Sequence, residues 1–579
     1  MLRQSNSSLG HRRGRGGQGT GLNDRSRIGH TAVDICDGRE CVLPVRDSYE
    51  ALYKEFSWNI PDHYNIGIDI CDKWADDRDK QALIYETSDG DMRRYSFHDL
   101  RTLSNRAANL FAARGIERGD RVAILLPQQP ETALSHIAAY KLGAIAVPLF
   151  TLFGFDALRY RLADSGTKAV VTDAAGAEKI AQIRDDLPQL EHVFCVDQPS
   201  SGGEDFHSLL QRASDSFMPV QTAAGDPALI IYTSGTTGAP KGALLPHRTL
   251  LGHLPGVEMS HDFLGFEGDL IWTPADWAWI GGLMDVLFAA WHLGVAVVAR
   301  RFGKFDPEAA FDLMARHAVR NVFLPPTALK LLRTVDNPAQ RWKLNLRSLA
   351  SGGESLGIEL LQWSRQQLGL TINEFYGQTE CNMTVSSCSA LFDVKPGAIG
   401  KAAPGHRVAV VDERGGIVPA GEQGRIAVHS PDPVMFLEYW NNAPATQAKF
   451  IGDWLVTGDM GMKDEQGYIT FVGRDDDVIT SAGYRIGPGP IEDCLLSHPA
   501  VRMAAVVGKP DPQRTEIVKA YVVLRAGVEA SDELTGELQQ HVRTRLSAHE
   551  YPREVRYIDA LPQTATGKII RRTLRDMDS

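Results

Sequence analysis

The chain has 579 residues, more than one hydrophobic core usually holds, so at least two domains are expected. Its apolar content of 43% and charged content of 23% are typical of a soluble globular protein, and the net charge of −11 gives no reason to expect nucleic-acid binding. The most apolar stretch, residues 283–299, is interrupted by Asp285 and His292, so no membrane span is expected.

The first thirty residues hold six arginines, seven glycines and one acid, with almost no large apolar side chain. Such a segment buries too little surface to offset its ordering entropy, so residues 1–45 are predicted to be disordered. An Arg- and Ser-rich start also suits an organelle transit peptide, but the glycines disfavour the amphipathic helix that such a peptide uses. We therefore expect a cytoplasmic protein.

The cysteines are odd in number, scattered, and without the paired spacing of a zinc site. This pattern favours free thiols in a reducing compartment. The seven are Cys36, Cys41, Cys71, Cys195, Cys381, Cys388 and Cys494.

From about Tyr49 the pattern becomes α/β. A predicted helix at residues 95–114 precedes a buried strand at 121–127, a helix at 136–142 and strands at 144–150 and 168–173. The same rhythm returns in short apolar segments at 228–233, 294–300, 321–326 and 346–353. Short apolar strands that alternate with helices indicate helix-covered, mostly parallel sheets, which we assign to a large N-terminal domain at residues 46–474.

After Gly473 a polar DDD run leads into a smaller unit. Two strands are predicted near residues 501–507 and 518–524, followed by a helix at 531–546. We therefore predict a separate α+β domain at residues 475–579.

Residues 232–242 read YTSGTTGAPKG and directly follow an apolar strand. Glycines let backbone N–H groups approach phosphate oxygens, hydroxyls donate hydrogen bonds, and a lysine adds positive charge. A Walker A loop is excluded, because Pro240 precedes the lysine and Gly242 follows it. The predicted phosphate-binding residues are Thr233, Ser234, Gly235, Thr236, Thr237, Gly238 and Lys241.

This loop resembles the phosphate loop of the adenylate-forming superfamily, which includes acyl-CoA synthetases, luciferases and peptide-synthetase adenylation domains. The resemblance extends over about residues 50–575 through motifs in the family's order, and their wording is closest to medium-chain acyl-CoA synthetases and acetyl-CoA synthetase-like ligases. It implies that a carboxylic acid is activated with ATP and Mg²⁺ as acyl-AMP, releasing pyrophosphate. Transfer of the acyl group to coenzyme A would then release AMP.

The resemblance assigns roles to residues in four further motifs of the large domain. SGGES at 351–355 matches the adenine-side loop, NEFYGQTE at 373–380 places Thr379 at the α-phosphate and Glu380 at the magnesium ion, and WLVTGDMG at 454–461 places Asp459 on the ribose hydroxyls. GYITFVGRDDDVI at 467–479 supplies Arg474, expected near the ribose and phosphates. The other ATP-site residues implied are Gly353, Glu354, Glu374, Phe375, Tyr376, Gly377, Gln378 and Phe471.

In the small domain the resemblance implies a lysine, a hinge and a thiol channel. Lys568, at the end of LPQTATGK, matches the lysine that contacts the substrate carboxylate and α-phosphate during adenylation. Asp476 matches the hinge about which the small, mobile domain rotates. In GYRIG (483–487), Gly483 and Tyr484 are expected beside the pantetheine of CoA and Arg485 beside phosphate. The chain departs from the family at Gly489 and Pro490, where we expect only a local change because proline is accepted in a first helical turn.

The acyl pocket is expected at TPADWAWIGGL (273–283) together with the 374–378 segment, which contains Gly377. Acetate-specific relatives carry tryptophan in the place of Gly377, so an acid larger than acetate is predicted, whether medium-chain, branched or aromatic. Amino-acid-activating relatives carry Asp in the place of Gly281, which disfavours that class. The predicted pocket residues are Trp277, Trp279, Ile280, Gly281 and Gly377.

Two alternatives stay open. The acyl group could pass to a carrier-protein phosphopantetheine, which presents the same thiol as CoA. A nucleotide-binding scaffold without catalysis is disfavoured by the intact set of Lys241, Glu380, Asp459, Arg474 and Lys568. The sequence does not decide between a monomer and a homodimer.

Overall fold

The computed structural model describes residues 34–36, 39–44, 46–87, 89–197, 202–233, 239–354, 356–481, 484–546, 550–564 and 568–577. Within the segment predicted to be disordered, β1 (Asp34–Cys36) pairs antiparallel with β2 (Arg39–Cys41). Leu43 is buried, and the backbone N–H groups of Val42 and Leu43 donate to Glu258 Oε1 at 2.5 and 3.2 Å. Packed structure therefore begins before residue 46, because a distant carboxylate holds this segment.

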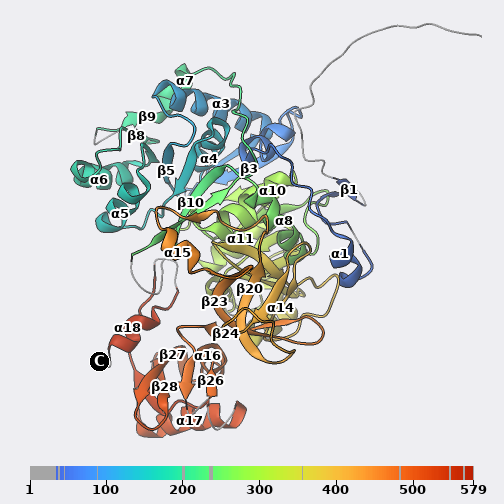
Figure 1. The fold of residues 1–579 in the computed structure, drawn as a ribbon, viewed down its shortest axis with the longest axis vertical. Coiled ribbons are helices and arrows are strands. Elements are labelled where there is room, and N and C mark those ends of the chain that lie inside the picture. Colours follow the sequence, from blue (N-terminus) through green and yellow to red (C-terminus); the bar gives the residue numbers. More distant parts are fainter. Residues whose placement is uncertain are drawn as a thin grey trace, which may run out of the picture.

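The first large sheet has eight strands, parallel from β10 to β9, with two antiparallel strands at one edge. Strands predicted at 121–127 and 168–173 are both present in it, and helices α3 to α7 accompany them (Figure 1). In spatial order the strands are β21 (Glu438–Tyr439), β11 (Lys241–Pro246), β10 (Pro227–Thr233), β6 (Ile145–Pro148), β5 (Arg121–Leu125), β7 (Ala169–Thr172), β8 (His192–Cys195) and β9 (Glu204–Asp205). The helices are α3 (Phe97–Ala113), α4 (Pro130–Leu142), α5 (Phe155–Ser165), α6 (Ala174–Ile183) and α7 (Phe206–Arg212).

Local sequence explains where these helices begin and end. Ser96 and Asp99 form a capping box at the start of α3, and Gly143 ends α4 in a left-handed conformation with φ of 73°. Every residue of α4 except Glu131 is buried, so this helix lies inside the domain rather than on its surface.

The second sheet has fourteen strands, and its strand pairing changes from parallel to antiparallel partway across the sheet. It is parallel from β3 to β16, as predicted, and antiparallel from β16 to β19, which the sequence pattern did not indicate. Its main order is β19 (Val408–Val411), β20 (Gln423–His429), β23 (Trp454–Lys463), β24 (Ile469–Arg474), β18 (Ala398–Ala402), β17 (Cys381–Ser386), β16 (Ile372–Gln378), β15 (Ser348–Gly352), β14 (Asn321–Phe323), β12 (Leu270–Trp272), β13 (Ala296–Ala299), β3 (Gln81–Glu86) and β4 (Met92–Ser96), with β22 (Phe450–Ile451) on β23.

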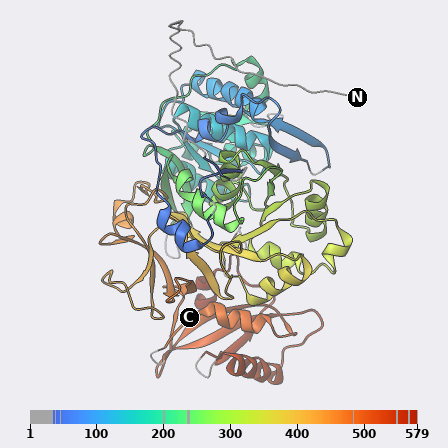
Figure 2. The same ribbon diagram turned by 90° about the vertical axis from the view of Figure 1, so that its right-hand side faces the viewer.

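Four helices accompany this sheet, in the green to yellow part of Figures 1 and 2. They are α8 (Thr249–Ser260), α11 (Pro307–Arg316), α12 (Pro326–Leu332) and α14 (Ile358–Gln367). The apolar run at 283–299 contains a π-helix, η3 (Leu283–Phe288), between α9 (Ile280–Gly282) and α10 (Ala289–His292). The shorter helices of the large region are α1 (Tyr49–Glu55), α2 (Ile66–Asp69), η1 (Asp72–Trp74), η2 (Arg184–Asp186), α13 (Pro338–Arg341) and α15 (Ala443–Gln447).

The C-terminal part forms a five-stranded sheet with its own buried core, drawn in red at the bottom of Figure 1. Both predicted strands and the predicted helix are present, as β27, β28 and α17. The strands are β25 (Ile479–Ser481), β26 (Tyr484–Ile486), β27 (Val501–Asp511), β28 (Thr515–Leu524) and β29 (Glu554–Tyr557), and the helices are α16 (Pro488–Leu496), α17 (Asp532–Arg545) and α18 (Arg571–Asp576).

The predicted α/β fold class is thus confirmed, with a distinct α+β unit at the C-terminal end. In the part of the chain that the structure describes, no helix is long and apolar enough to cross a membrane. Among the described residues, the buried free thiols include Cys71, Cys195, Cys381, Cys388 and Cys494.

Candidate active site

The ends of the predicted phosphate loop are held by two neighbouring strands. Thr233 is the last residue of β10 and pairs with Lys241, the first residue of β11. The Thr233 hydroxyl also donates a 3.4 Å hydrogen bond to the Lys241 carbonyl oxygen. The residues between them, 234–238, lie outside the described residues, so the predicted contacts of Ser234, Gly235, Thr236, Thr237 and Gly238 stay predictions.

A tyrosine that the sequence analysis did not single out links Lys241 to Glu380. The Lys241 ammonium lies 5.1 Å from the centroid of the Tyr439 ring, and the Tyr439 hydroxyl donates a hydrogen bond to Glu380 Oε1. Burial, followed by the adjacent Glu380 charge, raises the pKa of Tyr439. The two-residue strand β21 that carries Tyr439 has no motif or spacing that would have marked it as functional.

Glu380 itself is buried at the point where the two large sheets meet. Phe436 N donates to its carbonyl oxygen at 2.9 Å, and Thr379 and Glu380 form the two-residue connection between β16 and β17. Among the described residues no group of three or more His, Cys, Asp or Glu side chains could hold a metal ion. A single carboxylate is still chemically suited to Mg²⁺, which is commonly bound by one or two carboxylates together with substrate phosphates and water.

Asp459 lies on β23, directly opposite Arg474 on β24. Its Oδ2 accepts a 2.5 Å hydrogen bond from the Tyr376 hydroxyl, and its Oδ1 lies 3.2 Å from an Arg474 nitrogen. Phe471 completes the group, with its ring centroid 6.4 Å from that of Tyr376. Four predicted ATP-site residues from three strands are therefore brought together.

Asp459 is only 4% exposed, and its Oδ1 accepts no hydrogen bond of good geometry from the described residues. Burial raises the pKa of Asp459, although Arg474 and the Tyr376 hydrogen bond both act to lower it. A buried carboxylate oxygen with unused acceptor capacity is chemically suited to receive a ribose hydroxyl.

Glu374, which is predicted at the ATP site, lies on β16 next to the loop that follows β15. Its carboxyl lies inside the protein, Leu356 N points at Glu374 Oε1 from 3.4 Å, and burial raises the pKa of Glu374 to about 8. The Glu374 carboxyl therefore contacts the backbone of the loop that follows β15, at Leu356. Gly353 in that loop has φ of 94°, a conformation that favours glycine, and the neighbouring Glu354 has its pKa raised by burial.

Trp279 is a half-buried member of the predicted acyl pocket. A Cβ added at Gly281 or Gly353 would lie 2.9 or 3.0 Å from its indole, so both glycines are required for the ring to lie where it does. Its ring centroid is 5.7 Å from that of Phe323, which is in turn 5.1 Å from that of Phe375. These three aromatic rings form an apolar wall beside the adenine-side loop.

The other predicted pocket residues have packing roles. Trp277 and Ile280 are buried in the main core. A Cβ on Gly377 would lie 2.4 Å from Asn382 Oδ1 and 2.5 Å from the Met383 nitrogen, so only glycine fits beside β17. Gln378 is held by hydrogen bonds to Thr457 O at 2.8 Å and from Lys449 at 2.6 Å.

Lys568 reaches this group from the C-terminal unit. Its backbone N–H donates to Thr564 Oγ1 at 3.1 Å, which fixes the turn that presents it. The side chain is open to solvent on one side, yet surrounding protein desolvates the ammonium and lowers the pKa of Lys568. The charges of Glu354 and Asp459 act in the opposite direction, so both carboxylates favour the charged form of Lys568.

Around the predicted hinge, the Asp476 carbonyl accepts a 3.0 Å hydrogen bond from Arg575, and its carboxylate lies 3.9 Å from Arg474. Gly483 lies outside the described residues, as do the side chains of Tyr484 and Arg485, so their predicted CoA and phosphate contacts stay predictions. The family departure at Gly489 and Pro490 falls in the first turn of α16, where proline is accepted.

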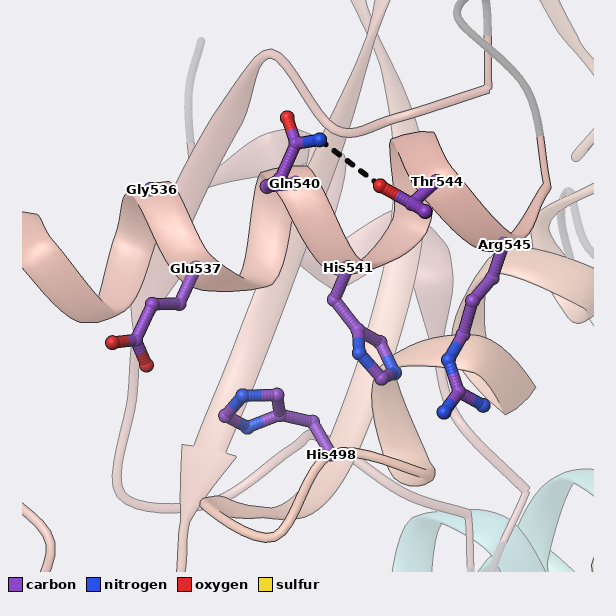
Figure 3. Close-up of a pocket in the computed structure, with 7 residues that line it drawn as sticks. All are labelled: His498, Gly536, Glu537, Gln540, His541, Thr544 and Arg545. Atoms are coloured by element: carbon purple, nitrogen blue, oxygen red, sulfur yellow. Dashed lines mark hydrogen bonds between the residues drawn. The ribbon is translucent and has the colours of Figure 1, made fainter.

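A separate cavity of about 550 Å³ lies on the outer helix of the C-terminal unit (Figure 3). It opens broadly to solvent, and none of the predicted site residues lines it, so it is not the candidate active site. Its lining residues are His498, Gly536, Glu537, Gln540, His541, Thr544 and Arg545.

Comparison with known proteins agrees with this arrangement. The family model "AMP-binding enzyme" matches residues 71–440, and "AMP-binding enzyme C-terminal domain" matches residues 490–568. The chain is 35% identical to the mitochondrial acyl-coenzyme A synthetase ACSM4 of Rattus norvegicus, over 92% of this chain and 93% of that protein. It is 36% identical to the acetyl-coenzyme A synthetase of Bacillus subtilis, over 91% and 94%.

Among solved structures, the anthranilate CoA ligase AuaEII in complex with anthranoyl-AMP superimposes with a TM-score of 0.82 at 28% identity, covering 90% of this chain and 98% of that one. The chain therefore belongs to the AMP-binding enzyme family, on its acyl-coenzyme A synthetase branch.

Proposed function

We propose that the protein activates a carboxylic acid larger than acetate as its acyl-adenylate and then forms the acyl-CoA thioester. The observation that carries the proposal is the grouping of Tyr376, Asp459 and Arg474 from three strands of the large region, on which the charge of Lys568 acts. Lys568 comes from the C-terminal unit, yet its charge acts on Asp459 and Glu354 of the large region. This is the arrangement expected for the adenylating half-reaction.

In that half-reaction the substrate carboxylate attacks the α-phosphorus of ATP and pyrophosphate leaves. The protein contributes positioning and charge stabilisation rather than a covalent intermediate. Lys568, Thr379 and Lys241 supply donors and positive charge for the α-phosphate. Glu380 would hold Mg²⁺, which neutralises phosphate charge when bound. Asp459 and Arg474 orient the nucleotide through the ribose.

In the second half-reaction the thiol of CoA attacks the acyl carbon, its proton is released, and AMP leaves. We propose that the C-terminal unit, residues 475–579, turns about Asp476 between the two half-reactions. The turn would withdraw Lys568 and bring Gly483 and Tyr484 to the acyl-adenylate. The Asp476 carboxylate lies 3.9 Å from Arg474 of the large region, and its carbonyl oxygen accepts from Arg575 of its own unit, so contacts to both units meet at Asp476.

The aromatic wall of Trp279, Phe323 and Phe375 supports an acid with an apolar or aromatic tail. Apolar pocket walls gain free energy by removing hydrocarbon surface from water, whereas acetate offers little such surface. The close fit of Gly377 against Asn382 means that its lack of a side chain also serves strand packing. Trp279 and its aromatic neighbours therefore support a larger acid more strongly than Gly377 does.

Transfer to a carrier-protein phosphopantetheine is the second candidate, because its thiol is chemically the same as that of CoA. The names of the relatives, which are CoA synthetases and a CoA ligase, favour CoA. A cytoplasmic location stays a prediction, since the mammalian relatives are mitochondrial.

The test is a panel of acids from acetate to octanoate with isobutyrate and benzoate, assayed for acid-dependent ATP–pyrophosphate exchange and for CoA-dependent AMP release. Both signals should appear with one or more acids larger than acetate. Exchange without CoA-dependent AMP release, together with transfer to a holo-carrier protein, would favour the second candidate. No exchange with any acid would contradict adenylation.

A further inference from the structure

Asp285, one of the two polar residues that interrupt the apolar run at 283–299, is buried in the π-helix η3 and fully engaged. Its Oδ2 accepts a 2.8 Å hydrogen bond from the Asn382 amide, which also lies 3.1 Å from Oδ1. His253 of α8 lies 2.7 Å away through Nδ1, and it is fully buried. The three side chains form a continuous polar chain from α8 through η3 to β17.

Asn382 joins this chain directly to the predicted catalytic turn. It is the second residue of β17, two positions after Glu380, and Gln378 pairs with Cys381 across the turn. It also lies against Gly377, where an added Cβ would meet its Oδ1 at 2.4 Å. The position of Asn382 therefore sets the position of the whole 377–380 segment.

The backbone around Asn382 departs from regular geometry. Met383 has φ of 56°, a left-handed conformation that side-chain-bearing residues rarely adopt, and the β16–β17 register shifts between Tyr376 and Gln378. Such strained backbone persists only when surrounding contacts hold it, and π-helical turns such as η3 are frequent at functional sites.

Helix α8 supplies the opposing surface. A Cβ on Gly256 would lie 2.2 Å from the Met383 carbonyl oxygen, so the helix backbone presses on β17 at the strained residue. His253 lies three positions earlier on the same helical face. Helix α8 thus contacts β17 directly through Gly256 and indirectly through His253, Asp285 and Asn382.

A buried carboxylate is a costly way to hold a strand, because its charge is removed from water. Burial raises the pKa of Asp285, while His253 and Asn382 act to lower it. An apolar residue in an otherwise apolar run would avoid that cost. The buried Asp285 carboxylate is therefore better explained by a need to fix the position of Asn382 than by a contribution to folding stability.

We propose that Asp285 is a positioning residue for adenylation: by holding Asn382, it fixes the Gly377–Glu380 segment against α8 in the geometry that the reaction requires. The inference rests on the proposed adenylating role of Thr379 and Glu380. Displacement of reacting groups by about 1 Å can lower a rate about 100-fold, so a positioning defect should appear in kcat.

The test compares Asp285→Ala, Asn382→Ala, the double variant and Asp285→Asn by thermal denaturation and by ATP–pyrophosphate exchange. Each alanine variant should lower the exchange kcat about 10- to 100-fold at a temperature well below its Tm. The exchange kcat of the double variant should be at most about twofold lower than that of Asp285→Ala, because the two substitutions break the same chain of contacts. Asp285→Asn, which can still accept from Asn382, should recover most of the activity.

Asp69 provides a matched control from the same kind of buried pair. It lies 2.5 Å from His292, the other residue that interrupts the apolar run, and accepts a 2.6 Å hydrogen bond from the Tyr64 hydroxyl. Asp69→Ala should lower Tm and leave the exchange kcat within about twofold of the parent value.

If Asp285→Ala and Asn382→Ala lower kcat no more than Asp69→Ala does, the proposal is wrong. A multiplicative loss in the double variant would also overturn it, and so would a failure of Asp285→Asn to exceed Asp285→Ala. Should Asp285→Ala not fold, Asn382→Ala and Asp285→Asn decide the question by the same kcat criterion. Absence of exchange in the unmodified protein would contradict the proposed function instead.

Discussion

The Tyr376 hydroxyl donates a 2.5 Å hydrogen bond to Asp459 Oδ2, which ties the strand leading into the Thr379–Glu380 turn to the strand that carries the proposed ribose carboxylate. The other oxygen, Oδ1, faces Arg474 at 3.2 Å. One carboxylate on β23 thus contacts residues of both β16 and β24, and because it is the proposed ribose acceptor, its removal should affect nucleotide binding most.

Asp459→Ala should raise the KM for ATP about 10- to 100-fold, because hydrogen bonds to a charged acceptor contribute about 1.5–3 kcal/mol. The KM for the acid should change little. Tyr376→Phe, which leaves the carboxylate in place, should have a smaller effect on the same constant. Titration of ATP at saturating acid measures both variants, and an equal rise in the KM for acid would count against a ribose role.

Lys568→Ala should lower adenylation on the order of 100-fold or more, since a preorganised cation is lost from the α-phosphate. Thioester formation from supplied acyl-adenylate and CoA should be retained, because Lys568 is proposed to leave the site before that step. Pyrophosphate exchange measures the first half-reaction, and thioester formation measures the second. Equal loss of both would argue against rotation of the C-terminal unit about Asp476.

Tyr439→Phe should weaken the binding of Mg·ATP, because the Glu380 carboxylate loses its buried hydroxyl donor. The same substitution removes the hydroxyl through which Tyr439 connects Lys241 to Glu380. We expect the KM for Mg·ATP to rise about tenfold, the value of one hydrogen bond to a charged group. Tyr64→Phe, which removes a similar tyrosine–carboxylate hydrogen bond to Asp69, is the matched control and should leave that KM unchanged.

Glu374 should make the protein less stable as pH rises. Its pKa is raised by burial from 4.5 to about 8, so between these values the folded state binds more protons than the unfolded state. The stabilisation is complete below about pH 4.5 and declines as pH rises to about 8, by at most about 1.4 kcal/mol per pH unit. Glu374→Gln should flatten this decline, as measured by urea unfolding at pH 5, 7 and 9. Parallel curves for the two proteins would show that Glu374 does not titrate in this range.

Trp279→Ala should shift the preference toward bulkier acids, because the indole occupies the space above Gly281 and Gly353. The ratio of kcat/KM for octanoate to that for butyrate should rise about tenfold, within the range that one or two methylene contacts provide. Trp291→Phe, a substitution in the buried core, is the control and should leave this ratio unchanged. An unchanged ratio in Trp279→Ala would remove that indole from the acyl pocket.

The sequence by itself determined the parallel strands, because these depend on local patterns, and its resemblance to a family supplied most of the candidate site residues. An apolar run such as 121–127 becomes a buried strand wherever helices cover it. The motifs predicted Asp459 and Arg474 near the same ribose, and the structure pairs these two residues on adjacent strands. Thr233 and Lys241 were likewise predicted as the two ends of one loop. Each of these relationships spans few residues, so local composition constrains it.

Only the tertiary structure decided the relationships between distant residues. Tyr439 meets Glu380 across 59 positions and Asn382 meets Asp285 across 97, and no local pattern encodes such a pairing. The inward orientation of Glu374 and the fit of Gly377 against Asn382 follow from strand pleat, a register shift and the position of α8. These contacts exist because two sheets and a helix close around one turn, and burial then sets both the hydrogen-bond partners and the pKa values of the groups enclosed there.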